Sequence, residues 1–168
     1  LAALELAAVA GVRVDPTEWR VACDLAGITI GRGFLDRMIL HRVLTQADSR
    51  GLDQALRFVH GLLRESLERS ARESGRVELW HRAIAETLEP RFETGEIEVA
   101  ERLAHHQRAA GRVEQSLEPL RAAAALYTAR AEYERAIEVL DDHAAAACAL
   151  EGPARTFEEV ENRLGEAE

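Results

Sequence analysis

Apolar residues recur with helical spacing along most of the chain, and the length of the apolar runs changes near residue 60. Before that point the runs are short, and the last two have the length of strands rather than of helices. The predicted elements are helices over residues 1–10, 15–27 and 32–42 and strands over residues 43–46 and 55–59. Three helices followed by a β-hairpin is the order of a winged helix.

The start of the second helix carries the clearest local signal in this region. Asp15 is a suitable N-cap, Pro16 occupies the first helical position, and Glu18 stands at the capping-box position. Gly27 is predicted to end this helix. The turn between the two strands is predicted at residues 48–51, where Asp, Ser, Arg and Gly follow one another.

From Gly61 onward the pattern predicts one helix after another. Turn-like residues recur at intervals of 20, 16, 20 and 21 residues. Each interval has room for one helix of about four turns and a short loop, which is typical of stacked helical hairpins. The turn-like residues are Gly75, Gly95, Gly111, Ala131 and Gly152.

Each of these helices carries one apolar stripe, which we interpret as a core-packing face. Alanine is frequent in the stripes, and small side chains allow neighbouring helices to approach closely, as solenoid stacking requires. Pro119 would break a helix interior, so its helix is predicted to begin near Ser116. The stripes are Val77, Trp80, Ile84 and Leu88; Leu117, Leu120, Ala124 and Tyr127; Tyr133, Ile137, Leu140 and Ala144; and, in a last helix that looks cut short, Phe157, Val160 and Leu164.

Composition supports an all-helical fold and narrows the chemistry. The chain has 168 residues, 47% of them apolar and 30% charged, and only four prolines. All 21 basic residues are arginine, which excludes a Schiff-base lysine and a phosphate-loop lysine. The net charge of −9 is uneven: residues 1–60 carry seven acidic residues and seven arginines, and the remainder carry 23 and 14. This acidic remainder does not favour a nucleic acid as partner.

The ends of the chain and its cysteines indicate a cytoplasmic fragment. The chain begins at Leu1 with a helical run, so we expect it to belong to a longer protein. Glu5 and the lack of a basic leader argue against a secretory signal, and no apolar run has the length of a membrane span. A disulfide between Cys23 and Cys148 is open, but two buried free thiols are the preferred interpretation.

We expect no catalytic and no metal-binding residues in this chain. The glycine-rich segment 27–33 lacks the ending of a phosphate loop and is predicted to be a loop between helices. Glu78 and His81 have the spacing of a di-iron half-site, but the sequence offers only one such pair. His105 and His106 are adjacent on a helix and therefore a poor chelate. The acidic residues near Glu158 are interpreted as a solvated helix face.

The order of motifs resembles the region after the ATPase core of STAND-type signalling ATPases, including bacterial regulators fused to a kinase, a cyclase or a DNA-binding domain. In that family a winged helix precedes tetratricopeptide-like repeats. The segments that carry the resemblance are residues 57–67, 79–85, 103–111 and 132–137. The resemblance implies a winged-helix-like module with its exit helix over residues 1–73. It also implies an α-solenoid of tetratricopeptide-like antiparallel helices over residues 74–168, truncated at the C-terminus.

The resemblance also implies one cofactor contact, at His60. In many STAND proteins a Met-His-Asp-like motif places its histidine near the β-phosphate of bound ADP. Val59, His60 and Gly61 stand at the matching place, with glycine replacing the aspartate. An imidazole at a helix start can donate to a phosphate oxygen. The alternative is a structural histidine that caps the helix, and the fragment alone is expected to bind no ADP or ATP.

The function expected from these features is a non-catalytic regulatory and protein-interaction segment of a larger signalling ATPase or kinase-linked regulator. Its partners would be a neighbouring ATPase domain and a protein or peptide in the groove of the repeats. The alternative is a DNA-binding winged helix with a basic third helix and hairpin, although the region has no net positive charge. The basic residues concerned are Arg32, Arg37, His41, Arg42, Arg50 and Arg57.

Overall fold

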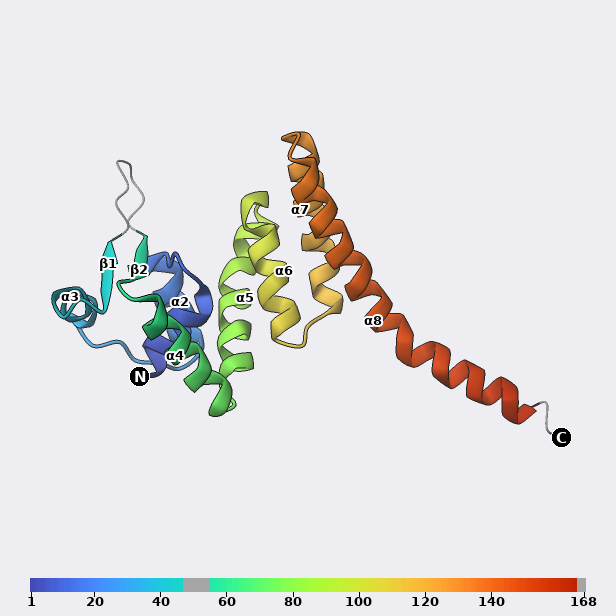
Figure 1. Cartoon of the computed structure of the whole chain (residues 1–168), viewed down its shortest axis with the longest axis horizontal. Helices are drawn as coiled ribbons and strands as arrows, with labels where there is room; N and C mark the ends of the chain where they lie inside the picture. The colour runs from blue at the N-terminus through green and yellow to red at the C-terminus, as the bar shows by residue number, and fades with distance from the viewer. Residues whose placement is uncertain (47–54, 166–168) are drawn as a thin grey trace. The chain divides into compact units, whose positions relative to one another are not determined.

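The computed structural model describes residues 1–46 and 55–165, with side chains described as far as residue 150. The described residues are mainly helical, with one small antiparallel sheet, as the sequence predicts (Figure 1). The chain divides into two units, Leu1–Glu93 and Thr94–Glu168. The division therefore falls after residue 93 and not after residue 73, because helix α5 (Val77–Glu93) packs against the first two helices. No described helix has both the length and the apolar character needed to cross a membrane.

The first unit has the element order expected from the sequence. A single residue between α1 and α2, Val14, also bridges to Leu56 by reciprocal backbone hydrogen bonds of 2.8 and 2.7 Å. The two strands are antiparallel, with Leu44 opposite Phe58. The predicted turn at 48–51 lies outside the described residues. The elements are α1 (Ala2–Ala10), α2 (Pro16–Leu25), α3 (Phe34–Leu40), β1 (Leu44–Gln46), β2 (Leu56–Phe58), α4 (Gly61–Glu73) and α5.

The predicted start of α2 is confirmed. One carboxylate oxygen of Asp15 accepts hydrogen bonds from the backbone N–H groups of Thr17, at 2.7 Å, and Glu18, at 3.0 Å. These bonds satisfy two of the N–H groups that a helix start leaves without partners. The side chain of Glu18 pairs with Arg91 of α5, so it ties α2 to α5.

Helix α3 is shorter than the predicted range of 32–42. Gly33 adopts a left-handed conformation with φ of 70°, so regular helix begins only at Phe34. At the other end Arg42 has φ of 55°, which stops the helix before β1. The segment between α2 and α3 is a loop, as predicted for residues 27–33.

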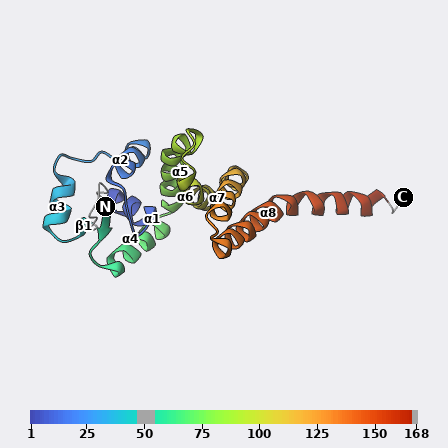
Figure 2. The ribbon, with the colours of Figure 1, turned by 90° about the horizontal axis from the view of Figure 1, so that it is seen from above.

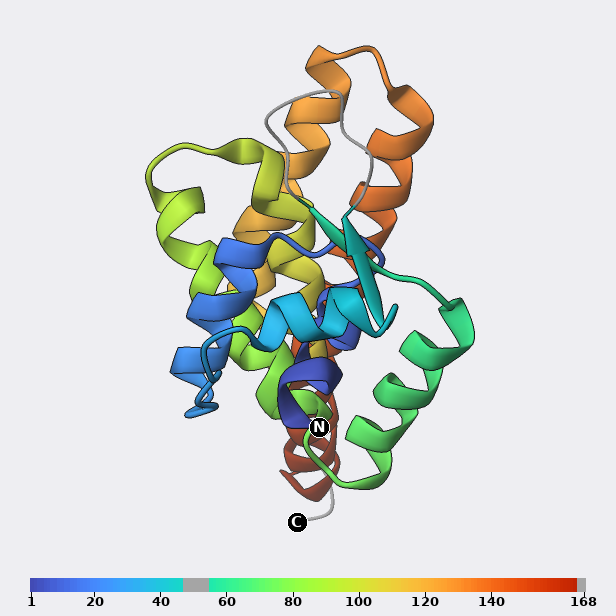
Figure 3. The same cartoon turned by 90° about the vertical axis from the view of Figure 1, so that its left-hand side faces the viewer.

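Helix α1 forms the centre of the first unit and packs against α2, α4 and α5 (Figure 3). Leu6 and Ala7 are almost fully buried, as are Trp19 and Cys23 of α2. The indole Nε1 of Trp19 donates a 2.9 Å hydrogen bond to the carbonyl of Ala3, which fixes the first turn of α1 against α2.

One charged side chain lies inside this apolar core. Glu5 of α1 is 0% exposed, and its carboxylate accepts hydrogen bonds from Arg76 Nε and Nη2 at 3.0 and 2.8 Å. Ser70 Oγ of α4 donates a third, at 2.8 Å. A buried carboxylate is tolerated only with such partners. The Glu5–Arg76–Ser70 cluster therefore fastens α1 to α4 and to the turn before α5.

The Glu5 carboxyl is held in its charged form. Burial alone would raise its pKa, but the hydrogen bonds from Arg76 and Ser70, with the charge of Arg76, lower the pKa below its ordinary value. The indole N–H of Trp80 acts in the same direction, although it does not reach the geometry of a full hydrogen bond. Because the folded-state pKa is lowered, this stabilisation is present above the unfolded-state pKa and is lost as the pH falls through the folded-state value.

We expect Glu5→Gln to lower the free energy of unfolding by about 1–3 kcal/mol at pH 7, because Arg76 loses its charged partner. The difference from the unsubstituted chain should shrink as the pH falls below the ordinary range of a carboxyl group. Urea denaturation at a series of pH values measures both effects, with Glu65→Gln at an exposed site of α4 as the control. A constant difference between pH 7 and pH 3 would show that the charge of Glu5 does not stabilise the fold.

Over residues 94–165, the part that the structure describes, the second unit has three helices and two short 3-10 turns. Left-handed residues precede or separate the helices at the predicted places, with φ of 94° at Gly95, 73° at Gly111 and 59° at Ala131. The turn predicted at Gly152 is wrong, because the last helix continues through it. The elements are η1 (Ile97–Val99), α6 (Ala100–Ala109), η2 (Glu114–Ser116), α7 (Leu117–Ala129) and α8 (Tyr133–Gly165).

Helices α7 and α8 lie side by side, and α6 also packs against α7 (Figures 1 and 2). The start of α7 is confirmed, with Ser116 as N-cap and Pro119 in its first turn. Leu120 and Ala124 of its predicted stripe are buried. Alanine side chains dominate the buried positions of both helices, which allows the close approach that the sequence indicated.

Two of the predicted stripes have different outcomes. Trp80, Ile84 and Leu88 of α5 are buried, as expected. The stripe of α8 is exposed, so its interpretation as a core-packing face is wrong for the described residues. The buried residues of α8 are Ala136, Val139 and Ala146, on another face of the helix. The stripe expected around Phe157 lies among side chains that are not described.

Both cysteines are free, but only one of them is buried, contrary to the expectation. Cys23 is fully buried in the core of the first unit. Burial, and next the charge of Asp24, raises the pKa of the Cys23 thiol to about 12. Cys148 is exposed on α8. The two thiols should therefore differ strongly in reactivity, because the thiolate is the reactive form.

In the folded chain we expect a thiol reagent such as dithionitrobenzoate to modify Cys148 within minutes at pH 8 and to leave Cys23 unmodified. Complete reaction of both thiols should require denaturant. The absorbance of the released thiolate counts the groups, and Cys148→Ser should abolish the fast phase. Rapid release of two equivalents without denaturant would contradict the buried position of Cys23.

Candidate protein-interaction surface

A groove of about 580 Å³ lies between α6 and α8 in the second unit. Its floor is made of small side chains, mainly alanines of α8, and its edges carry charged or polar groups. Arg108 Nη1 of α6 and Asp142 Oδ1 of α8 are 3.0 Å apart and form an ion pair across it. The lining residues are His105, Arg108, Ala109, Val113, Asp142, Ala145, Ala146 and Ala149.

A polar network fixes the three helices relative to one another. Glu101 of α6 accepts a hydrogen bond from the Tyr127 hydroxyl of α7 and forms an ion pair with Arg135 of α8. Arg135 also pairs with Glu138, one turn along α8. Outside the network, Arg130 and Glu98 pair at 2.8 Å. The carboxylate of Glu101 is thus the point at which all three helices meet.

This network shifts the pKa values of its members. The hydrogen bond to Glu138 and the charge of Glu101 raise the pKa of Arg135 against the opposing effect of burial. The hydrogen bond to Glu101, and next burial, raises the pKa of Tyr127. Both groups therefore keep their protons over the whole neutral range, and the three helices remain linked there.

These long-range pairs were not predicted from the sequence, although the sequence carries a signal for them. Arg135 lies 34 residues after Glu101. Asp142 likewise lies 34 residues after Arg108. Thirty-four residues is the length of one tetratricopeptide unit, and it is the separation expected between equivalent positions of consecutive repeats in an array of that kind. A search for opposite charges at that separation would have found both.

Helix α8 presents a second surface, an exposed apolar stripe. We call it the α8 stripe and define it as Tyr133, Ile137, Leu140 and Ala144, all of which are exposed. The exposed fractions of the three large side chains are 62%, 58% and 50%. The spacing of four, three and four residues places them on one side of the helix.

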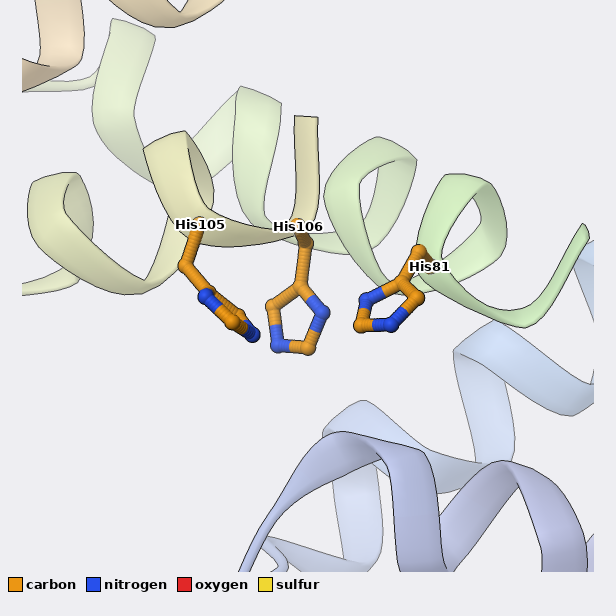
Figure 4. A group of neighbouring side chains, drawn as sticks. All are labelled: His81, His105 and His106. Atoms are coloured by element: carbon orange, nitrogen blue, oxygen red, sulfur yellow. The ribbon is translucent and has the colours of Figure 1, made fainter. Parts of the chain in front are cut away.

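His105 and His106 of α6 are nearer to each other than their adjacent positions suggested. Their rings meet edge to face with centroids 5.1 Å apart (Figure 4). His106 is buried and His105 is exposed, and His105 borders the groove. Figure 4 also draws His81 of α5, which belongs to the first unit.

His60, the one residue implied as a cofactor contact, is exposed at the N-cap of α4. His60 therefore occupies the capping position that the alternative assigns to it, but its side chain makes no capping hydrogen bond. Gly61, which replaces an aspartate of the motif, is the first residue of α4. The imidazole is therefore free of a capping duty and accessible at the start of a helix.

The face expected to contact DNA in the alternative function is exposed around α3. No residue of α3 is buried, and Arg37 points to solvent together with Arg32, His41, Arg42 and, on β2, Arg57. Arg50 lies outside the described residues. A cleft of about 440 Å³ between α2 and α3 is lined by carboxylates as well as arginines, namely Asp24, Asp36, Arg20 and Arg32.

No protein-family model, curated protein or solved structure matches this chain.

Replacing Tyr127 by Phe should cost about 0.5–1 kcal/mol of unfolding free energy, because the charged acceptor Glu101 loses one donor and the site is partly exposed. Since the pKa of Tyr127 is raised in the folded state, this contribution should persist up to the unfolded-state pKa and disappear as the pH rises through the folded value. Guanidinium denaturation at pH 7 and pH 11 measures both effects. Equal stability of the two proteins at pH 7 would rule out a role for this hydrogen bond.

Proposed function

We propose that the chain is a non-catalytic regulatory and protein-interaction segment of a larger STAND-type signalling ATPase. The observation that carries the proposal is the pair of ion pairs between α6 and α8, each joining residues 34 residues apart. In a tetratricopeptide-like array, equivalent positions of consecutive repeats lie side by side, and the two ion pairs support such an arrangement of the second unit.

The first unit supports the winged-helix part of the proposal. Its first three helices, α1 to α3, precede two antiparallel strands, and the bridge between Val14 and Leu56 adds a third short extended segment. In the proposal this unit contacts the neighbouring ATPase domain and holds it in its resting state.

His60 would act as the nucleotide contact of that resting state. It is exposed at the N-terminus of the 13-residue helix α4, where backbone N–H groups and the helix dipole favour a phosphate. The rest of the ADP or ATP site would lie on the ATPase domain. The protein would be cytoplasmic and bacterial, and its other partner would be a protein or peptide in the groove between α6 and α8.

The groove suits a polypeptide rather than a small polar substrate. Its floor is alanine, which leaves room for side chains of a partner, and its edges offer Arg108 and Asp142 for hydrogen bonds to a backbone. Within the described part of the second unit, no nucleophile and base lie together in this groove. The proposal is therefore binding and not catalysis.

In the full-length protein, we expect His60→Gln to accelerate the release of bound ADP by about tenfold or more, since a hydrogen bond to a charged group contributes about 1.5–3 kcal/mol. The release of fluorescent ADP in a chase experiment measures the rate. His41→Gln, at another exposed histidine of the first unit, should leave it unchanged.

Two outcomes would count against this function. Unchanged ADP release in His60→Gln would remove the nucleotide contact. A 168-residue chain that binds ADP by itself, or that neither binds nor inhibits the ATPase domain supplied separately, would contradict the regulatory role.

DNA binding is the second candidate, favoured by the exposure of α3 and its arginines. Asp36 lies on the same helix, and residues 1–60 carry equal numbers of acidic residues and arginines. A domain that reads DNA usually has a clear basic excess. Binding of the chain to duplex DNA that weakens steeply with salt would favour this candidate over the first.

A further inference from the structure

The α8 stripe is an apolar surface that the described residues leave uncovered. Its three large side chains are each at least half exposed, whereas Ala136, Val139 and Ala146 on another face of α8 are buried. Isolated exposed apolar residues need no explanation, but a stripe in helical register on an otherwise charged helix marks an interaction surface.

Comparison with α6 indicates what shape of partner fits this surface. The residues that stand 34 positions earlier in the sequence than Tyr133, Ile137 and Leu140 are Val99, Leu103 and His106. Those three residues are only 2%, 1% and 3% exposed. Helix α7 packs against α6 and the preceding turn η1, so the elements that carry these positions have another helix of the second unit beside them. The equivalent surface of α8 is thus built to receive a helix.

The residues along one edge of the α8 stripe indicate the charge of that partner. Glu134 and Asp141 are exposed there, and among the described residues neither forms an ion pair. The equivalent residues of α6 are the uncharged Ala100 and Gln107, both buried. A covering helix without cationic side chains would remove both carboxylates from water and give them no partner, which costs free energy. A helix with cationic side chains along the matching edge would give both carboxylates a partner.

We propose that the α8 stripe binds an amphipathic α-helix of a partner protein whose apolar face is flanked by arginine or lysine. Apolar residues of the partner at i, i+3 or i+4, and i+7 would cover Tyr133, Ile137 and Leu140. Its basic edge would pair with Glu134 and Asp141. The inference rests on the proposed function only in treating this chain as a binding module, and it uses a surface other than the α6–α8 groove.

A second copy of this chain does not meet these requirements. If two α8 helices packed antiparallel through their stripes, the edges that carry Glu134 and Asp141 would face each other across the twofold axis. Like charges placed opposite in this way destabilise the pair. The net charge of the chain, −9, adds to the repulsion.

The test is selection of displayed helices on the 168-residue chain. The library carries a fixed Leu-based apolar face, with the flanking positions randomised among Arg, Glu, Gln and Ala. We expect enriched helices to carry Arg at the flanking positions and to bind the Ile137→Asp variant about tenfold or more weakly. The matched control Leu62→Asp, at an exposed apolar residue of α4, should bind as the unsubstituted chain does.

Charge reversal then tests the edge separately from the apolar face. The double variant Glu134→Arg with Asp141→Arg should reverse the selection towards Glu at the flanking positions. Circular dichroism and thermal melting confirm that each variant is folded. The ADP-release assay with His60→Gln does not involve this surface, so the two proposals can fail independently.

Three results would overturn the inference. Enriched helices without a charge preference would remove the role of Glu134 and Asp141. Equal binding to Ile137→Asp would place the partner elsewhere, the α6–α8 groove included. Self-association of the unsubstituted chain in sedimentation, abolished by Ile137→Asp, would show that a second copy covers the stripe.

Discussion

An amphipathic helix cannot keep its apolar side in water at low free energy, and this constraint organises both units of the chain. Each helix must find a surface that covers its stripe. In the first unit α1 meets this requirement most completely, because α2, α4 and α5 surround it. In the second unit α7 is covered on two sides, by α6 and by α8. Only one of the two apolar faces of α8 is covered by described residues.

Burying α1 on several sides creates an electrostatic problem that Glu5 shows clearly. The carboxylate has no route to solvent, so Arg76 and Ser70 must meet it where α4 gives way to α5. A buried ion pair seldom stabilises a fold more than apolar residues of the same size would. In the observed placement of α1, Glu5 reaches both partners, and a displacement of the helix would leave the buried carboxylate without them. We therefore regard Glu5 as the residue that selects the position of the central helix.

The local elements could be predicted from the sequence where a single residue type decides the backbone. Asp15 and Pro16 determine the start of α2, and Gly75 and Gly111 end helices in left-handed conformations. Gly152 shows the limit of this reasoning, because glycine permits a turn without requiring one. At Gly33 the error was the reverse: the residue was placed inside the predicted helix, but it adopts the left-handed conformation, so α3 begins after it.

Candidate site features were harder to predict because they depend on pairs of distant residues. The apolar period of α8 is the same whether the stripe is covered or exposed, so the pattern alone assigned Tyr133 and Ile137 to a core. Glu101 and Arg135 become partners only when α6 and α8 are placed side by side. Their separation of 34 residues, which matches the length of one tetratricopeptide unit, is the signal of that placement in the sequence.

The distribution of charge around the α8 stripe determines which partners can bind it. Between residues 94 and 150 the chain has ten acidic residues and six arginines, and the arginines at 108, 130 and 135 are already engaged in ion pairs within the unit. Two exposed carboxylates that form no ion pair among the described residues, Glu134 and Asp141, lie on α8 beside the stripe. Such a field would keep copies of the chain apart while leaving the apolar surface available. It would also raise the rate at which a basic helix reaches the stripe, so that the apolar contacts provide affinity and the carboxylates select the partner.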